Sequence, residues 1–204
     1  MDNSNINIRS FCTINKGRIV ANGIQKLGFE ASTTSEFLTL AYKDLKLDYS
    51  KFFKMDNLSK LAMLGTEVLL ESDTSFDGND AVALCFFNAQ SSLDSDWNHQ
   101  KLINQNKVVS PSVFVYTLPN ILMGELAIKH NWHGENLFIL ASAFNFDSWL
   151  MEAKKLFALN KAQFCIGGWV EVFEEHYDLK LFFAEKASSV NALSIEKIKT
   201  LIST

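Results

Sequence analysis

The chain has 204 residues, of which 48% are apolar and 21% charged, so it can bury one sizeable core. Its net charge is -4, and no cluster of lysines or arginines would follow a phosphate backbone, which argues against nucleic-acid binding. No apolar run approaches the roughly 20 residues that span a bilayer. We therefore expect one domain over residues 1–204, without a membrane span.

The N-terminus and the cysteines indicate a cytoplasmic protein. The first residues lack the basic segment and apolar stretch of a secretory signal. The three cysteines, Cys12, Cys85 and Cys165, are odd in number and each lies in an apolar run. Buried free thiols in a reducing compartment are the simplest interpretation of this pattern.

The first half of the chain predicts a strand, a long helix and a second strand. Ile6–Ile14 alternates roughly between apolar and polar residues, as a strand does, whereas the stretch 15–55 is mixed and has room for a short helix. Asp56 is a plausible N-cap for a helix over Asn57–Glu71, whose apolar residues repeat at helical spacing. Ala81–Phe87 is a continuous apolar run, typical of a strand covered on both faces.

The middle of the chain predicts three helices around a third strand. The first helix covers Ser92–Asn104, and the second begins near Pro119 and ends near His130. Leu137–Ala141 is the third strand, and Asn145 can cap a third helix that ends near Leu159. Within the second helix a glycine costs roughly 1 kcal/mol against alanine, so we expect another backbone to pack closely against it.

The last part predicts two strands and a final helix. Phe164–Phe173 and Leu179–Glu185 flank the polar turn Glu174–Asp178, and an amphipathic helix covers the stretch from Leu193 to about Ser203. Buried strands that alternate with helices indicate an α/β layered sandwich with a mostly parallel five-stranded sheet. The last two strands are close enough to form an antiparallel pair at one edge.

The stretch 110–168 carries the most specific pattern. Ser110-Pro111 precedes a loop, Asn120 and Gly124 belong to the following helix, Gly134 lies in the next turn, and Gly167-Gly168 lies in a strand. With this pattern the chain resembles the β-ketoacyl synthases of the thiolase-like superfamily, most of all the short proteins related to their N-terminal halves and to chain length factors. The resemblance implies half of a thiolase-like fold.

In that family the catalytic cysteine stands at the turn between the third strand and the next helix. A count forward from Gly124 and Gly134 without a gap places this position on Ala143, whereas a count back from Gly168 places it on Ser142. We favour Ala143, because the loop before the fourth strand absorbs a one-residue difference more readily than a strand-helix turn. The resemblance also implies two catalytic histidines in a second half, which we expect this chain to lack.

Covalent acyl transfer needs an activated nucleophile, a base and an oxyanion hole. A cysteine at a helix N-terminus supplies the nucleophile, because the helix stabilises its thiolate, but Ala143 has nothing to deprotonate. We therefore predict a catalytically inactive, chain-length-factor-like subunit with no metal and no cofactor. The resemblance implies a full-length ketosynthase as partner, contact with acyl carrier protein only through it, and a role in fatty-acid or polyketide biosynthesis, aryl-polyene or flexirubin-type pigments included.

Two other functions stay open at this point. Ser142 could serve a stand-alone serine acyl hydrolase or transferase, although no neighbouring base is evident in the sequence. We expect all four histidines, His99, His130, His133 and His176, to be solvated rather than catalytic or metal-bound. The other alternative is a homodimeric acyl-binding scaffold with no ketosynthase partner.

The loop before the Asn120 helix is the expected acyl-tunnel and interface segment. In ketosynthase dimers this loop crosses the interface and lines the acyl pocket of the other subunit. The resemblance places Val113 and Thr117 on the lining positions, with Phe114 and Tyr116 beside them and with Asn120 and Phe144 as further interface residues. The 17 phenylalanines also favour burial against another chain. Plain interface packing, without a tunnel role, is the alternative for this loop.

Overall fold

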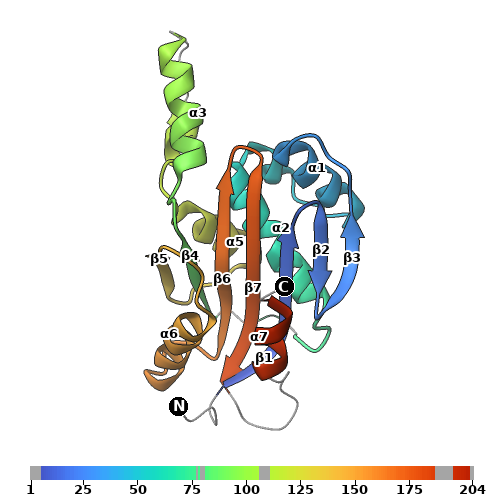
Figure 1. Cartoon of the computed structure of the whole chain (residues 1–204). Helices are drawn as coiled ribbons and strands as arrows, with labels where there is room; N and C mark the ends of the chain where they lie inside the picture. Colours follow the sequence, from blue (N-terminus) through green and yellow to red (C-terminus); the bar gives the residue numbers. More distant parts are fainter. Residues whose placement is uncertain (1–5, 77, 79–80, 106–110, 187–194, 203–204) are drawn as a thin grey trace.

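The computed structural model describes residues 6–76, 78, 81–105, 111–186 and 195–202. Within them, seven strands form one sheet in the order β3-β2-β1-β7-β6-β4-β5 (Figure 1). The predicted α/β class is confirmed. Ser110, one of the residues that carry the resemblance, lies outside the described residues.

The strands and helices have the following bounds. The strands are β1 (Ile6–Asn15), β2 (Arg18–Ala21), β3 (Ile24–Gly28), β4 (Val82–Asn88), β5 (Asn136–Leu140), β6 (Phe164–Phe173) and β7 (His176–Lys186). The helices are α1 (Thr34–Asp44), α2 (Asn57–Glu71), α3 (Leu93–Asn104), α4 (Pro111–Val115), α5 (Ile121–His130), α6 (Phe146–Ala158) and α7 (Ile195–Ile202), with a 3-10 turn at Ser50–Lys54. Among the described residues, no helix is long and apolar enough to cross a membrane.

The strand pairing differs from the mostly parallel sheet that the sequence predicts. Only β6-β4 and β4-β5 are parallel, whereas the other four pairings among the described strands are antiparallel. The β6-β7 hairpin lies in the middle of the sheet rather than at an edge, because β1 pairs along β7 from Ile6↔Lys186 to Asn15↔Asp178. The prediction of five strands with an antiparallel edge pair is therefore wrong.

The hairpin β2-β3 is the part that the sequence prediction missed. Tight two-residue turns at Lys16-Gly17 and Asn22-Gly23 reverse the chain, and all four residues have positive φ, with Gly17 at +75° and Gly23 at +83°. Such turns match the twist of antiparallel strands and favour Asn-Gly pairs. Because these strands are short and β3 is largely exposed, their apolar periodicity is weak.

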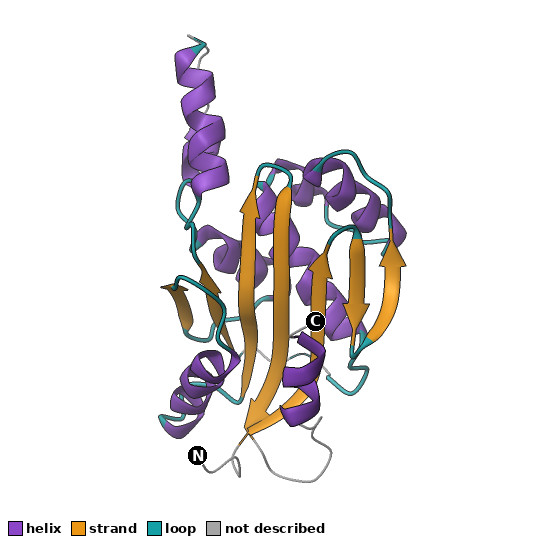
Figure 2. Ribbon diagram, in the orientation of Figure 1, coloured by secondary structure: helices purple, strands orange, loops and turns teal. Residues whose placement is uncertain are grey.

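Helices cover both faces of the sheet (Figure 2). One hydrophobic core lies between the sheet and α1, α2 and α5, and a second lies between the sheet and α6 and α7. The predicted helix Asn57–Glu71 is confirmed as α2, and the Asp56 carboxylate caps it by accepting the Ser59 N–H at 2.9 Å. Gly65 lets α2 lie against β7, since a Cβ atom there would come within 2.9 Å of Leu179.

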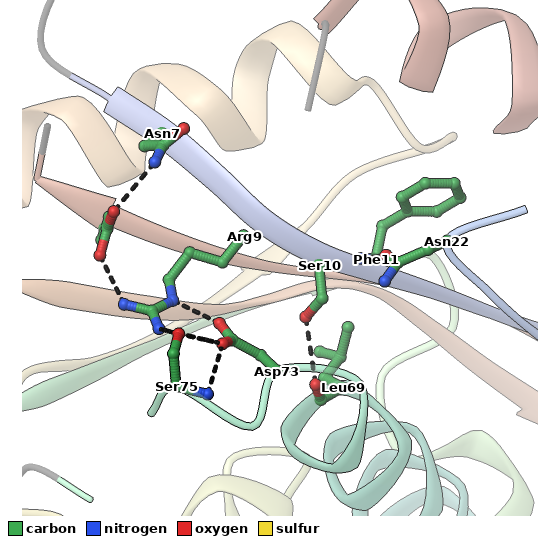
Figure 3. Close-up of polar contacts among 9 residues, drawn as sticks. Asn7, Arg9, Ser10, Phe11, Asn22, Leu69, Asp73 and Ser75 are labelled. Atoms are coloured by element: carbon green, nitrogen blue, oxygen red, sulfur yellow. Dashed lines mark hydrogen bonds and ion pairs between the residues drawn. The ribbon is translucent and has the colours of Figure 1, made fainter. Parts of the chain in front are cut away.

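A partly buried arginine ties the loop after α2 to the sheet (Figure 3). Arg9 on β1 forms an ion pair with Asp73, donates to Glu185 of β7 at 2.6 Å, and donates to Ser75 at 2.6 Å. Its guanidinium also lies 5.3 Å from the centre of the Phe183 ring. One cation therefore links β1, β7 and the loop that leads toward β4.

Candidate functional site

The turn between β5 and α6 contains the two candidate nucleophile positions. Ser142 and Ala143 are both exposed there, at the carboxyl ends of the parallel strands β4 and β5. The Ala141 N–H donates to the Asn88 carbonyl oxygen at 2.9 Å and thus holds the start of the turn against β4. Asn145 caps α6 as predicted, since its side-chain oxygen accepts a first-turn N–H at 3.0 Å. Ligands of α/β proteins commonly bind at this end of parallel strands.

Ser142 and Ala143 line a cavity of about 710 Å³. Phe144 contributes an aromatic wall, stacked at 5.8 Å on Phe182 and tilted at 6.2 Å from Trp169. The charged and titratable residues of the lining are Asp147, Glu171, His176, Asp178, Lys180 and Lys199. The cavity therefore joins apolar rings with several ionisable groups beside the expected nucleophile turn.

Glu171 is the buried acid of this cavity. On β6 it pairs with Asp178 of β7, and its side chain is buried on the face that α6 and α7 cover. Its Oε2 accepts the Ala89 N–H at 2.7 Å, whereas no described group donates to Oε1. Burial raises the pKa of Glu171, although the N–H groups of Ala89 and Gln90 act in the opposite direction. Its position next to the polar turn Glu174–Asp178 would suggest a solvated side chain, but the structure buries it.

Ser142 has no partner that would activate it. His176 lines the same cavity, but it is exposed at the start of β7, and no described hydrogen bond joins it to Ser142. A serine nucleophile needs a base within about 3 Å. The cavity therefore gathers a serine, a histidine and an acid without the hydrogen bonds of a catalytic triad.

The other histidines and the cysteines lie away from this cavity. His130 is not solvated as expected, because it stacks on Trp132 at 4.4 Å and lies 2.9 Å from a Glu67 carboxylate oxygen. The three cysteines are buried and free, as predicted, and burial raises the pKa of the Cys85 thiol to about 12. Among the described residues, no group of three or more His, Cys, Asp or Glu side chains could hold a metal ion.

The expected tunnel residues divide into two groups. Val113 and Tyr116 line a separate cavity of about 230 Å³ between α4 and the starts of α2 and α3, and Tyr116 donates to Glu125 at 2.9 Å. Phe114 is instead 60% exposed. Thr117 is half-buried, and its hydroxyl donates to the Phe114 carbonyl oxygen at 2.7 Å. Some of these side chains thus face the chain's own interior, whereas others can meet a partner.

Asn120 and Gly124 belong to α5 and its N-terminus. Asn120 is the N-cap residue, but its side chain makes no capping hydrogen bond. A Cβ atom at Gly124 would meet nothing within 4 Å, so none of the described residues supplies the closely packed backbone that the sequence leads us to expect there. Close packing does explain Gly134 and Gly167, where a Cβ would lie 2.2 Å from the Val82 oxygen and 1.8 Å from the Cys85 oxygen.

Comparison with known proteins rests on structure, since no protein-family model matches the chain and no curated protein matches it. It superposes on the ishigamide ketosynthase/chain length factor with a TM-score of 0.64 and 15% identity, over 92% of this chain. It also superposes on the ketosynthase ApeO in complex with its chain length factor ApeC, from Xenorhabdus doucetiae, with a TM-score of 0.62 and 14% identity over 98% of this chain. The chain has a ketosynthase-like fold.

A type II polyketide ketosynthase bound to its acyl carrier protein and a hexaketide, AntDE:AntF, is a further neighbour, with a TM-score of 0.61 and 11% identity over 90% of this chain. The chain spans 64% of the matched ishigamide chain and 63% of the AntDE:AntF chain, but 90% of the matched chain in the ApeO–ApeC complex. The ketosynthase-like fold is therefore shared with two chains that are considerably longer than this one and with one chain of similar length.

Proposed function

We propose that this protein is a non-catalytic, chain-length-factor-like subunit that pairs with a full-length β-ketoacyl-ACP synthase and shapes its acyl tunnel. The observation that carries the proposal is a ketosynthase-like fold whose nucleophile turn offers only Ala143 and Ser142. The pathway is fatty-acid or polyketide extension, aryl-polyene and flexirubin-type pigments included, and acyl carrier protein contacts the subunit through its partner. Resemblance to ketosynthase and chain-length-factor complexes supports this choice.

The chemistry of the turn favours a supporting role. The partial positive charge at the α6 N-terminus would lower the pKa of a cysteine thiol at this position. The methyl group of Ala143 carries no ionisable proton, and the hydroxyl of Ser142 would need a base to lose its own. Ala143 cannot form an acyl-enzyme bond, and Ser142 has no described base. The partner would supply the catalytic thiol and the histidines, while this chain would supply part of the wall of the acyl tunnel.

The free edge of the sheet is a suitable pairing surface. Within the described residues, β5 pairs only with β4, and its other edge has no strand beside it. Its sequence, NLFIL, carries no charge or proline that would discourage pairing, and Leu140 is 59% exposed. Unprotected apolar edges readily add a strand from another chain. Phe114, Leu118 and Ile128 are further exposed apolar side chains on neighbouring elements.

Pairing can be tested directly. The chain and a ketosynthase encoded nearby would be co-expressed, and the mass of the purified complex measured by light scattering. We expect a stable complex that extends acyl-ACP, while the isolated chain neither condenses nor hydrolyses acyl thioesters. Turnover by the isolated chain that disappears in Ser142→Ala, with labelling of Ser142 by a fluorophosphonate, would instead establish the serine enzyme.

The tunnel role predicts a change in product length. Thr117→Phe should shorten the product, because an added ring occupies the space of several methylenes. Val113→Ala should lengthen the product or leave it unchanged, and Phe114, Tyr116, Asn120 and Phe144 would form the surrounding wall and interface. Mass spectrometry of products from the reconstituted complex measures this effect.

Thr117→Val is the matched control, since it removes the hydroxyl without adding a ring. We expect this control to keep the length distribution of the parent complex. If the Thr117→Phe complex assembles and is active but makes products of unchanged length, the segment before α5 only packs at the interface and does not line the acyl tunnel.

A further inference from the structure

Glu171 is buried in the cavity beside the β5–α6 turn without an ion pair. Its side chain is 6% exposed, and none of the described ion pairs includes it. The Ala89 N–H occupies Oε2 at 2.7 Å, while Oε1 has no described donor and its residue lines the cavity. Buried polar atoms in folded proteins almost always have a partner. The free oxygen therefore indicates a donor that is not part of the described chain.

The other charges of the cavity lining neutralise each other. Lys180 lies 2.6 Å from Asp178 on β7, and Lys199 of α7 lies 2.7 Å from Asp147 of α6. These two pairs leave the carboxylate of Glu171 as the unbalanced charge. A negatively charged ligand would be repelled by it, whereas a cation would complete the balance.

Two neighbouring features do not reverse this preference. The N-terminus of α6 carries partial positive charge, but Asn145 caps it and Asp147 lies in its first turn, which offsets the dipole. His176 lines the same cavity and acts on the Glu171 carboxylate through its charge, but none of the described hydrogen bonds or ion pairs joins the two side chains. A ligand with its own N–H donors is thus needed to reach Oε1.

The aromatic lining favours a flat cation. Phe144 and Trp169 line the cavity with their rings 6.2 Å apart, and the faces of such rings attract guanidinium groups. The chain already holds one guanidinium in this way. Arg9 lies 5.6 Å and 5.3 Å from the centres of two phenylalanine rings while its nitrogens contact two carboxylates.

We propose that this cavity binds a flat cation with N–H donors, of the guanidinium or amidinium type, which donates to Glu171 Oε1 and lies against Phe144 and Trp169. An alkylammonium ion lacks the flat face, and a neutral ring lacks the charge. The site does not depend on pairing with a ketosynthase, because all of its groups belong to this chain.

Benzamidine is the probe that tests the site. Titrated into the full chain and followed by calorimetry, it should bind at least tenfold more tightly than benzamide, its neutral counterpart, or benzoate. Glu171→Gln should weaken benzamidine binding at least tenfold. Glu152→Gln, the same change at a glutamate of α6 outside the cavity lining, should change binding less than threefold.

A second measurement needs no variant. Burial raises the pKa of Glu171, and the groups that face it are His176, Asp178 and Lys180 on β7 with Asp147 and Lys199 on α6 and α7. Affinity for benzamidine should therefore fall as the pH drops from 8 to 5 and this carboxylate takes up a proton. Equal binding of benzamidine and benzamide, or unchanged binding by Glu171→Gln, would overturn the proposal.

The same titration separates two sources of the cation. If saturating ketosynthase prevents benzamidine binding, the natural ligand is an arginine side chain of that partner. If benzamidine binds the complex as tightly as the isolated chain, the natural ligand is a free small cation.

Discussion

Arg9, which is partly buried, and Glu171, which is buried, have opposite surroundings. Arg9 has carboxylates, a hydroxyl and aromatic rings around it, and its hydrogen bond holds the pKa of Asp73 below the usual range. Glu171 accepts the Ala89 N–H on Oε2 and takes part in none of the described ion pairs, and burial raises its pKa. Pairing offsets the desolvation cost of a charge, whereas an incompletely paired buried charge lowers stability and can mark a binding site.

Glu171→Gln should flatten the pH dependence of stability. Because the pKa of Glu171 is raised in the folded protein, its contribution to stability is full below about pH 4.3, the ordinary glutamate value, and declines as the pH rises through the folded value. The neutral amide avoids this loss. We expect the variant to gain about 1 kcal/mol relative to the parent between pH 4.5 and 7.5, measured by urea unfolding.

Asp147→Asn serves as the control for this measurement, since Asp147 is exposed and paired with Lys199. If the unfolding free energies of Glu171→Gln and Asp147→Asn differ from that of the parent by the same amount at every pH, Glu171 is fully solvated in solution.

At the scale of elements, α5 contains a glycine that disfavours the helix and has open space around it in the described part of the chain. Gly124 lies inside α5, where glycine is a poor helix former. Nothing in the described chain lies within 4 Å of a Cβ built there, and Ile128, one turn further on, is 65% exposed. This face is therefore open among the described residues, and a ketosynthase backbone could pack against it in the proposed pairing.

Gly124→Ala should therefore act in opposite directions on the chain and on the complex. The isolated chain should gain about 0.8 kcal/mol in unfolding free energy, because alanine favours the helix and meets no obstacle. The ketosynthase complex should weaken if the partner backbone packs against Gly124. Thermal unfolding and a pull-down measure the two effects.

Gly134→Ala provides the contrast for the Gly124 variant. Its Cβ would lie 2.2 Å from the Val82 oxygen, so it should destabilise the chain itself. If Gly124→Ala stabilises the isolated chain but leaves its binding to the ketosynthase unchanged, the partner does not pack against this face of α5.

At the scale of the whole molecule, apolar surface is concentrated away from the two cores. The edge strand β5 and the segment around α4 expose Leu140, Phe114 and Leu118, and α3 projects beyond the sheet with Trp97 45% exposed (Figure 1). Contiguous apolar surface on a protein generally belongs to an interface. These exposed side chains are compatible with the pairing that we propose.

The isolated chain should self-associate at micromolar concentration, because the β5 edge can pair with a strand of another copy and the exposed apolar side chains can be buried in the contact. Leu140→Lys should reduce this association by placing a charge on the edge strand. Light scattering after size exclusion measures both, with Leu159→Lys, an exposed change at the end of α6, as control. A monodisperse monomer of the parent chain would contradict the prediction.

The sequence by itself determined the elements that rest on local signals. The Asp56 cap and helical spacing predicted α2 with its bounds, and the Asn145 cap predicted the start of α6. Continuous apolar residues predicted β4, because a strand covered on both faces leaves no polar position. The pattern 110–168 indicated the ketosynthase-like fold and the turn that contains Ser142 and Ala143.

Only the tertiary structure decided which elements are neighbours. The strand β7 pairs with β1 from the far end of the chain, and no local pattern records a contact between residues so distant. The Asn22-Gly23 turn was a readable hairpin signal, but the exposed strand β3 concealed it. Glu171 resembles any surface glutamate in sequence, and its burial follows from the alternation of β6 against α6 and α7 together with the approach of the Ala89 backbone. Long-range packing of this kind sets the pKa and the pairing of a charge, and therefore sets the chemistry of the cavity.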